Sequence, residues 1–276
     1  MPNLPCALAM LFHCFPFPES HDRSFLDRIP EAESFSASDL FSQLPPGVDV
    51  QPREKIFSEW FAAGHVPRHL LQFKPIQVFE RGHHLIYWVM PDYLSLGNDS
   101  DFVHTPLTWT ATRDLAAHWE FLVPTAKMVD QIYQQSTRVH WPHAYPPSEE
   151  MRSTAYFVDH SRWIAARTSL EWVDHPLIAG HKKDLVVTPR LLSKKTKLAI
   201  YGWHNLGNGA AIQPLSLWHG QFYVDYSHGI RFVAPLAELD GKPVKMSAVL
   251  ADPQLAPLVS FEGAFDICAV LGYVCS

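Results

Sequence analysis

The chain has 276 residues, of which 47% are hydrophobic and 18% are charged, and these values exclude a disordered chain. Its 22 Lys and Arg residues are outnumbered by 28 Asp and Glu residues. The resulting net charge of -6 argues against a protein that holds nucleic acid by its overall charge. The 23 prolines indicate short elements joined by turns. The 16 histidines are a supply of metal ligands and general bases.

The N-terminal part of the chain differs in character from the rest. We predict a leader or loosely packed arm over residues 1–50 and a single domain over residues 51–276. The apolar segment 4–17 is interrupted by prolines and has no basic region before it, so it matches neither a membrane span nor a standard signal peptide. Secretion or periplasmic export and a cytoplasmic location both stay open. The oligomeric state is not indicated by the sequence.

The cysteines do not form a metal-binding or redox motif. None of them lies in a CxxC pair, so disulfides and free thiols both remain open. They are found near the two ends of the chain, at Cys6, Cys14, Cys268 and Cys275.

Hydrophobic periodicity predicts helices and one hairpin in the N-terminal half. Apolar residues recur at steps of three or four in the helical segments and alternate in the strands. The predicted elements are a helix over 51–63, a hairpin with strands 76–79 and 85–89, a helix from Thr110 or Thr112 to about 121, and a helix over 126–135 capped by Thr125.

The C-terminal half is predicted to be rich in strands. A proline-rich stretch over 140–148 precedes it, and a subdomain boundary is expected near residue 145. The predicted strands are 156–158, 185–188, 198–201, 222–224 and 230–233. The fold class is therefore α+β, with a helical N-terminal half that contains a small hairpin and a mixed or antiparallel sheet in the C-terminal half.

Histidines flanked by glycine are concentrated between residues 180 and 231. They occur in GHKKD at 180–184, YGWH at 201–204, WHG at 218–220 and DYSHGIR at 225–231. Glycine lets the backbone adopt positive φ and approach closely, as in loops that shape a pocket. We therefore predict a His/Asp-rich catalytic site formed by His181, Asp184, His204, His219, Asp225, Ser227 and His228.

One version of this site depends on a metal. Three imidazoles, or two together with Asp184 or Asp225, could hold Zn²⁺ with an open position for water. The ion would lower the pKa of that water to near 7 and so create a hydrolytic nucleophile. The spacing matches no HExxH motif, so zinc is one of several alternatives. The candidate ligands are His181, His204, His219 and His228.

Another version needs no metal. Asp225 and Ser227 are two residues apart, so they share one face of an extended segment, whereas His228 points to the other face. Ser227 would therefore need a histidine from a neighbouring strand as its base. Acid–base catalysis by His and Asp without a covalent step is the second metal-free alternative.

The ligand expected at this site is a small molecule or a polymer with an anionic group. Lys183 adjoins the histidines and is the candidate to bind that charge. No GxGxxG or GxxxxGK[ST] motif supports nucleotide binding, and no nucleic-acid-binding motif occurs. The other candidate substrate-binding residues are Trp203, Tyr226 and Arg231.

The same residues also have structural interpretations. A histidine at the edge of a strand often hydrogen-bonds a backbone carbonyl. Asp225 and Arg231 could form an ion pair, and Trp203 and Trp218 could lie in the core. These interpretations stay open beside the functional ones.

Two resemblances bear on the same segments. GHKKD, IYGWH, IQPL and DYSHGIR, with VMPDYLSLGNDSDF and LVPTAKMVDQIY upstream, resemble a family of uncharacterised bacterial proteins over roughly residues 55–233. That resemblance implies a shared fold and brings no activity with it. Ser227 to Arg231 is also similar to the SHGC-I-R signature of the L,D-transpeptidases. The nucleophilic Cys of that family is absent between Gly229 and Ile230, so no catalytic role is carried over.

Taken together, the residues predict a hydrolase-like enzyme. Its substrate is expected to contain the amide or glycan bonds of an extracytoplasmic polymer, with zinc as the candidate cofactor. The alternative is a non-catalytic module that binds a carbohydrate or a peptide. In that case Trp203, Trp218, Tyr223 and Tyr226 would form an aromatic platform.

Overall fold

A computed structural model describes residues 24–31, 35–44, 50–167 and 176–274. The predicted α+β class is confirmed, with helices mainly in the N-terminal half and sheets mostly in the C-terminal half. The apolar segment 4–17 lies outside the described residues, as do Cys6, Cys14 and Cys275.

Helices form where capping residues precede segments with one apolar face. Thr125 Oγ accepts a hydrogen bond from the Met128 backbone N–H at 3.1 Å and so begins α4, as predicted. The preceding α3 is capped by Thr108, not by the predicted Thr110 or Thr112. The α-helices are α1 (Ala37–Ser42), α2 (Val50–Ala62), α3 (Trp109–Trp119), α4 (Ala126–Gln135), α5 (Thr154–Ala165), α6 (Met246–Ala251) and α7 (Ile267–Leu271). Short 3-10 helices are η1 (Ser24–Arg28), η2 (Arg68–Leu71), η3 (Glu149–Arg152), η5 (Pro189–Leu192) and η6 (Ala256–Leu258).

The strands form two four-stranded sheets and two small pairs. One sheet has the order β1-β2-β11-β12, the other has the order β10-β7-β8-β9, and β3-β4 and β5-β6 form the pairs. The strands are β1 (Lys74–Glu80), β2 (His83–Val89), β3 (Ser95–Gly97), β4 (Phe102–His104), β5 (Arg138–Val139), β6 (Ile178–Ala179), β7 (Lys183–Leu185), β8 (Ile200–His204), β9 (Ala211–Ser216), β10 (His228–Gly229), β11 (Val233–Leu239) and β12 (Lys242–Lys245).

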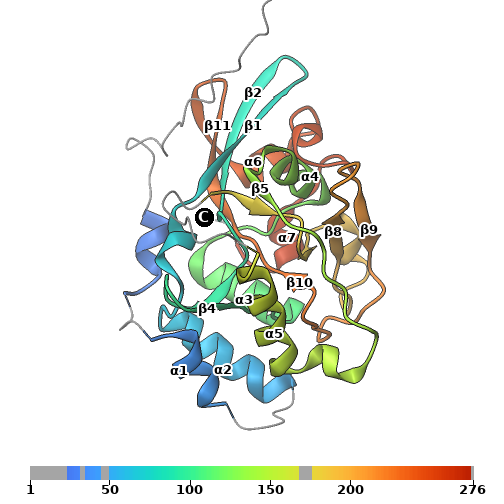
Figure 1. The fold of residues 1–276 in the computed structure, drawn as a ribbon. Coiled ribbons are helices and arrows are strands. Elements are labelled where there is room, and N and C mark those ends of the chain that lie inside the picture. Colours follow the sequence, from blue (N-terminus) through green and yellow to red (C-terminus); the bar gives the residue numbers. More distant parts are fainter. Residues whose placement is uncertain (1–23, 32–34, 45–49, 168–175, 275–276) are drawn as a thin grey trace, which may run out of the picture.

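The predicted hairpin is β1 and β2, and it belongs to a larger sheet. Strand β2 also pairs with β11, so a strand from the far end of the chain completes the sheet that the hairpin begins. In Figure 1 these strands extend from one end of the molecule, and α1 and α2 lie at the opposite end. The second sheet, with β7, β8 and β10, contains the histidine-rich segments.

A single apolar cluster runs through the described chain. It includes Ile29 and Leu40 from the segment predicted as a loose arm, and it continues to Leu271 in α7. Residues on both sides of position 145 belong to it. Both sheets therefore share one core.

Two predicted strands are absent, and a third, 230–233, is displaced, since β10 ends at Gly229 and β11 begins only at Val233. Residues 156–158 lie inside α5, because Ser153 Oγ accepts a hydrogen bond from the Tyr156 backbone N–H at 3.2 Å and caps a helix. Residues 222–224 form no strand, because the Tyr223 backbone N–H bonds to the Gly220 carbonyl at 2.9 Å in a turn. In both cases short aromatic and β-branched runs favour a strand locally, while capping or turn geometry decides the outcome.

Candidate functional site

The predicted site residues separate into three environments. His228, Asp225, Ser227, His219, Lys183 and Trp203 lie around the ends of β7, β8 and β10. His181 lies instead beside Asp92 and His104, in the interior. The remaining residues, Asp184, His204, Tyr226 and Arg231, are buried and have other partners. The four histidines proposed as one zinc site are therefore divided among different surroundings.

Parallel pairing of two short strands builds the first environment. His228 of β10 is the register partner of Lys183 of β7, and the Lys183 backbone N–H donates to the Ser227 carbonyl at 2.7 Å. Paired residues on neighbouring strands face the same side of a sheet, so His228 and Lys183 share a face. We call Lys183, Trp203, His219, Tyr223, Asp225 and His228 the His228 cluster.

A buried carboxylate, Asp225, is held rigidly in the His228 cluster. Its Oδ1 accepts the Ser227 backbone N–H at 2.7 Å and the Ser227 hydroxyl at 2.6 Å, and its Oδ2 accepts the Tyr223 hydroxyl at 3.0 Å. Burial acts to raise the pKa of Asp225, but the neighbouring His228, Ser227 and Lys183 hold that pKa below its usual value. Asp225 is therefore an ionised carboxylate with fixed orientation.

Ser227 orients Asp225 and is not paired with a histidine. Its hydroxyl is donated to the carboxylate, and the side chain is fully buried. A serine nucleophile needs a base within hydrogen-bond reach. The geometry therefore favours acid–base chemistry over the serine-triad alternative.

His228 is the group of this cluster with unused hydrogen-bonding capacity. Its Nε2 lies 3.9 Å from Asp225 Oδ2, which is too long for a hydrogen bond, and neither ring nitrogen has a hydrogen-bond partner among the described residues. Burial lowers the pKa of the imidazole to about 4, although Asp225 acts in the opposite direction. The ring is therefore neutral at pH 7 and able to accept a proton.

Half-buried side chains surround the buried Asp225 and His228. The His219 ring stacks on the Tyr223 ring with centroids 3.9 Å apart, and its centroid lies 6.3 Å from that of His228. Lys183 Nζ lies 4.5 Å from the centroid of the Trp203 ring. Beside them, Trp218 and Phe222 are 81% and 51% exposed. The cluster thus combines a protected base, a cation and an aromatic rim.

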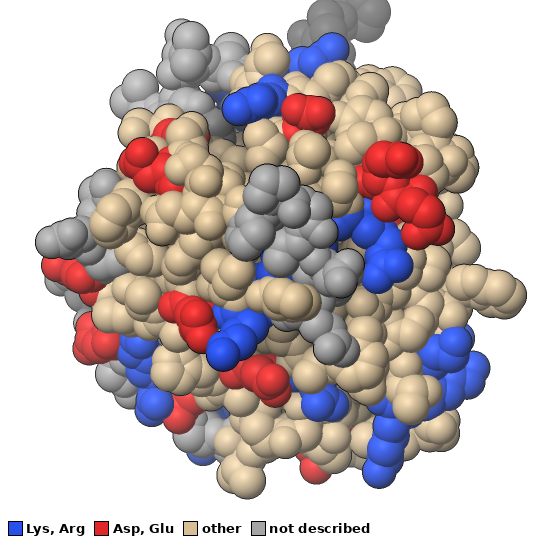
Figure 2. Space-filling view, turned by 90° about the horizontal axis from the view of Figure 1, so that it is seen from below, with Lys and Arg blue, Asp and Glu red and all other residues tan. Residues whose placement is uncertain are grey.

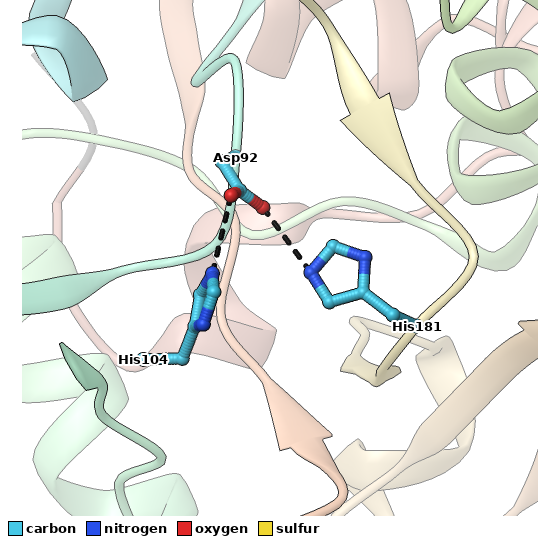
Figure 3. A group of neighbouring side chains, drawn as sticks. All are labelled: Asp92, His104 and His181. Carbon is cyan, nitrogen blue, oxygen red and sulfur yellow. Dashed lines mark hydrogen bonds and ion pairs between the residues drawn. The ribbon is translucent and has the colours of Figure 1, made fainter. Parts of the chain in front are cut away.

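The second environment is a compact group that we call the Asp92 triad: Asp92, His104 and His181. Its potential ligand atoms all lie within 4.8 Å of one another. Asp92 Oδ2 is 3.1 Å from His104 Nε2, and Asp92 Oδ1 is 3.4 Å from His181 Nε2. In Figure 3 the carboxylate lies between the two rings, with one oxygen directed to each. This buried His/Asp cluster could hold a metal ion.

Close backbone approach positions the triad. His181 follows Gly180, which has a φ of +99°, and a Cβ there would lie 2.8 Å from the His140 carbonyl oxygen. Gly229 lies beside Tyr93, where a Cβ would come within 2.6 Å of the ring. The Tyr93 ring in turn contacts the His181 ring edge-on, with centroids 4.9 Å apart. Glycine is therefore required at position 180, directly before His181, and at position 229, where the Tyr93 ring packs.

Burial also sets the protonation states in the triad. It lowers the pKa of His104, and it lowers the pKa of His181 to about 4. Burial acts to raise the pKa of Asp92, but the two imidazoles hold it well below its usual value. An ionised carboxylate between neutral imidazoles results.

The remaining predicted residues make hydrogen bonds inside the protein. His204 Nε2 is 2.9 Å from Asp130 Oδ1, and the ring stacks on Tyr133 with centroids 4.2 Å apart. Asp184 Oδ2 accepts the Tyr93 hydroxyl at 2.8 Å, and burial raises the pKa of Asp184 to about 6. His204 and Asp184 thus have the structural roles that the sequence left open.

Two predicted substrate-binding residues are also internal. The Tyr226 hydroxyl accepts the Tyr145 backbone N–H at 2.6 Å. The Arg231 guanidinium donates to the carbonyls of Met90 and Ile178, each at 2.5 Å, and does not pair with Asp225. Both side chains are almost fully buried, so neither faces a ligand on the surface.

Sequence reasoning missed Asp92 and His104. Asp92 follows the apolar end of β2, and His104 ends the short strand β4, so each is a polar residue beside a buried strand. Lys182, which the sequence placed beside Lys183 as a residue that could hold an anionic group, is instead fully buried: its Nζ hydrogen-bonds His160 Nδ1 at 3.0 Å and the Tyr226 carbonyl at 2.6 Å. A polar residue next to an apolar run was the one available signal.

No protein-family model, no curated protein and no solved structure matches this chain. Within the described ranges, no helix combines the length and the apolar character needed to cross a membrane. On the face shown in Figure 2, basic and acidic side chains are intermingled. That face carries no broad basic surface of the kind that binds nucleic acid.

Proposed function

We propose that the protein is a hydrolase in which His228 acts as general base and Asp225 stabilises the protonated imidazole. One observation carries this proposal: a neutral, buried His228 with no hydrogen-bond partner lies beside an ionised, rigidly held carboxylate and the Lys183 cation. An imidazole left unsatisfied in the interior costs free energy unless a ligand uses it. Such groups are concentrated at functional sites.

The proposed step is the attack of water on a carbonyl carbon. As the water oxygen forms its bond to carbon, His228 accepts one proton from the water. The imidazolium is stabilised by the Asp225 carboxylate, whose Oδ2 lies 3.9 Å from Nε2. The bond from carbon to the leaving nitrogen then breaks as the imidazolium returns the proton to that nitrogen. His228 ends the cycle neutral.

An amide bond fits this cluster better than a glycosidic bond. Glycosidases generally use two carboxylates on either side of the scissile bond. Among the described residues of the His228 cluster, Asp225 is the single carboxylate. Lys183 shares a face with His228 and supports an anionic group elsewhere on the substrate.

The proposed function is tested by comparing the hydrolysis of an anionic probe with that of a neutral one. We expect the wild type to hydrolyse a succinyl-alanine p-nitroanilide faster than its neutral acetyl counterpart. Lys183→Met is expected to raise KM for the succinyl probe about tenfold, equivalent to about 1.4 kcal/mol, and to leave the acetyl probe unchanged. The exposed Lys195 supplies the matched control, Lys195→Met, which should leave both probes unchanged.

The exposed aromatic rim supports a second candidate function, a binding module. Trp218 and Phe222 present large apolar surfaces next to His219 and Tyr223, and exposed aromatics of this kind bind sugars and peptides. This candidate predicts that the probes bind without release of p-nitroaniline. Absence of turnover of every probe, together with saturable binding, would favour it over the hydrolase.

A further inference from the structure

We propose that the Asp92 triad binds one divalent transition-metal ion, with Zn²⁺ as its preferred occupant. This site is separate from the His228 cluster, and the inference does not depend on the proposed hydrolase activity. Two histidines and one carboxylate are a common ligand set for zinc, with a fourth position left for water or another group.

The distances support this assignment. Zinc ligands lie about 2.0–2.2 Å from the ion, so ligand atoms in a tetrahedral site are roughly 3.2–3.6 Å apart. Asp92 lies 3.1 Å from His104 Nε2 and 3.4 Å from His181 Nε2. Two of the donor separations are therefore close to the required value, one to each carboxylate oxygen, and all the potential ligand atoms lie within 4.8 Å of one another. Each ligand comes from a different part of the fold: Asp92 from the segment after β2, His104 from the end of β4 and His181 from the segment before β7.

The unsatisfied ring of His181 is an independent observation that points to a ligand. Its side chain is 0% exposed, Nδ1 has no hydrogen-bond partner among the described residues, and Nε2 has only the long 3.4 Å ion-pair contact with Asp92 Oδ1. Buried imidazoles are normally hydrogen-bonded because an unpaired polar group in the interior is costly. A cation bound at Nε2, beside Asp92 Oδ1, would satisfy that nitrogen and also balance the buried negative charge.

The surroundings of His104 fit the same role. Its Nδ1 lies 3.1 Å from Ser161 Oγ, while its Nε2 faces Asp92. Metal-bound histidines usually hydrogen-bond through the second ring nitrogen, which fixes the ring and leaves the first nitrogen free to bind the ion. Ser161 is thus placed to orient His104 for metal binding.

A hollow on the surface comes within one side chain of the buried triad. It has a volume of about 720 Å³ and lies between α1, the loop around residues 99–103 and α5. Ser161 lines this hollow and contacts His104 on its other side. One side chain therefore separates the hollow from a proposed metal ligand.

The test uses the full chain and metal ions alone, without substrate. Metal-free protein is titrated with Zn²⁺ against a chromogenic chelator, and with Co²⁺ while visible absorption is recorded. We expect one zinc per chain and cobalt d–d bands. His181→Gln should weaken zinc binding at least tenfold and remove those bands. The matched control is His204→Gln, because His204 is buried and bonded to Asp130, outside the triad.

X-ray absorption of the zinc-loaded wild type tests the proposal without any variant. The expected spectrum contains two imidazole nitrogens and oxygen donors near 2 Å. Failure of the wild type to bind zinc at micromolar free ion would overturn the proposal. So would equal binding by folded His181→Gln, or a spectrum with sulfur ligands or fewer than two imidazoles. Because no substrate is involved, these results are independent of the outcome for the hydrolase.

Discussion

Replacing His228 with Gln is expected to lower the rate of amide hydrolysis by about 10²–10⁴-fold, the usual contribution of a general base. Glutamine has a similar size and remains polar, but it cannot accept a proton at neutral pH. The loss should appear in kcat, because His228 acts on the attacking water. Lys183, on the neighbouring strand, would still hold the anionic group, so KM should change little.

The exposed His118 provides the control for this prediction. It lies on α3, which is remote along the chain from β7 and β10. His118→Gln should therefore retain full activity. Both variants are compared by succinyl-alanine p-nitroanilide hydrolysis and by circular dichroism. If folded His228→Gln keeps more than about a tenth of the wild-type kcat, His228 is not the base.

Replacing Arg231 with Met is expected to destabilise the fold by about 3–5 kcal/mol, the usual cost of removing one partner from a buried charged network. The guanidinium is fully buried and donates to two carbonyls, those of Met90 and Ile178. It also lies 4.5 Å from the centroid of the Tyr93 ring. The substitution therefore leaves two carbonyl groups unpaired and Asp184 without its nearby positive charge.

Urea unfolding followed by tryptophan fluorescence measures this effect. Arg190 supplies the control, because its ion pair with Glu262 at 2.7 Å is solvent-exposed. Arg190→Met should cost less than about 1 kcal/mol. If Arg231→Met lowers the free energy of unfolding by less than about 1 kcal/mol, these hydrogen bonds do not stabilise the fold. Arg231 would then again be a candidate for ligand binding.

Much of the local structure followed from the sequence. The spacing around Thr125 predicted α4 with the bounds that the structure shows, and alternation predicted the β1–β2 hairpin. These signals succeed because capping and periodicity act over a few residues. The strand predicted over 156–158 was wrong because three residues are too few to distinguish a strand from one face of a helix.

The candidate site was predicted in part. Glycine-flanked histidines led to Asp225, His228 and Lys183, which the parallel pairing of β7 and β10 brings together. The same pattern could not separate His204 from His228. That difference depends on whether Asp130, which is 74 residues away from His204 along the chain, supplies a hydrogen bond.

The Asp92 triad depends on tertiary structure throughout. Its carboxylate, Asp92, is 12 residues from His104 and far from His181 along the chain, so no spacing rule links the three. Only the packing of β4 and the turn at Gly180 around the end of β2 brings them together. Metal sites assembled from distant segments leave no compact motif in a single sequence.

The pH dependence of hydrolysis tests the central claim, that His228 works as a neutral base with a depressed pKa. The groups that act on this pKa are Asp225, which raises it, and Lys183, His219 and Lys182, which lower it; burial, the largest cause, lowers it to about 4. A base must be unprotonated, so activity should persist as the pH falls and be lost only as it passes through the folded pKa.

The measurement is kcat/KM for the neutral acetyl probe, which has no titrating carboxyl group, between pH 3.5 and pH 8, with circular dichroism and recovery at pH 7 checked at each point. We expect the acid limb near pH 4, where His228 becomes protonated. A limb near pH 6.5, the value of an unperturbed imidazole, would contradict the account. A profile with no acid limb while the protein remains folded would contradict it as well.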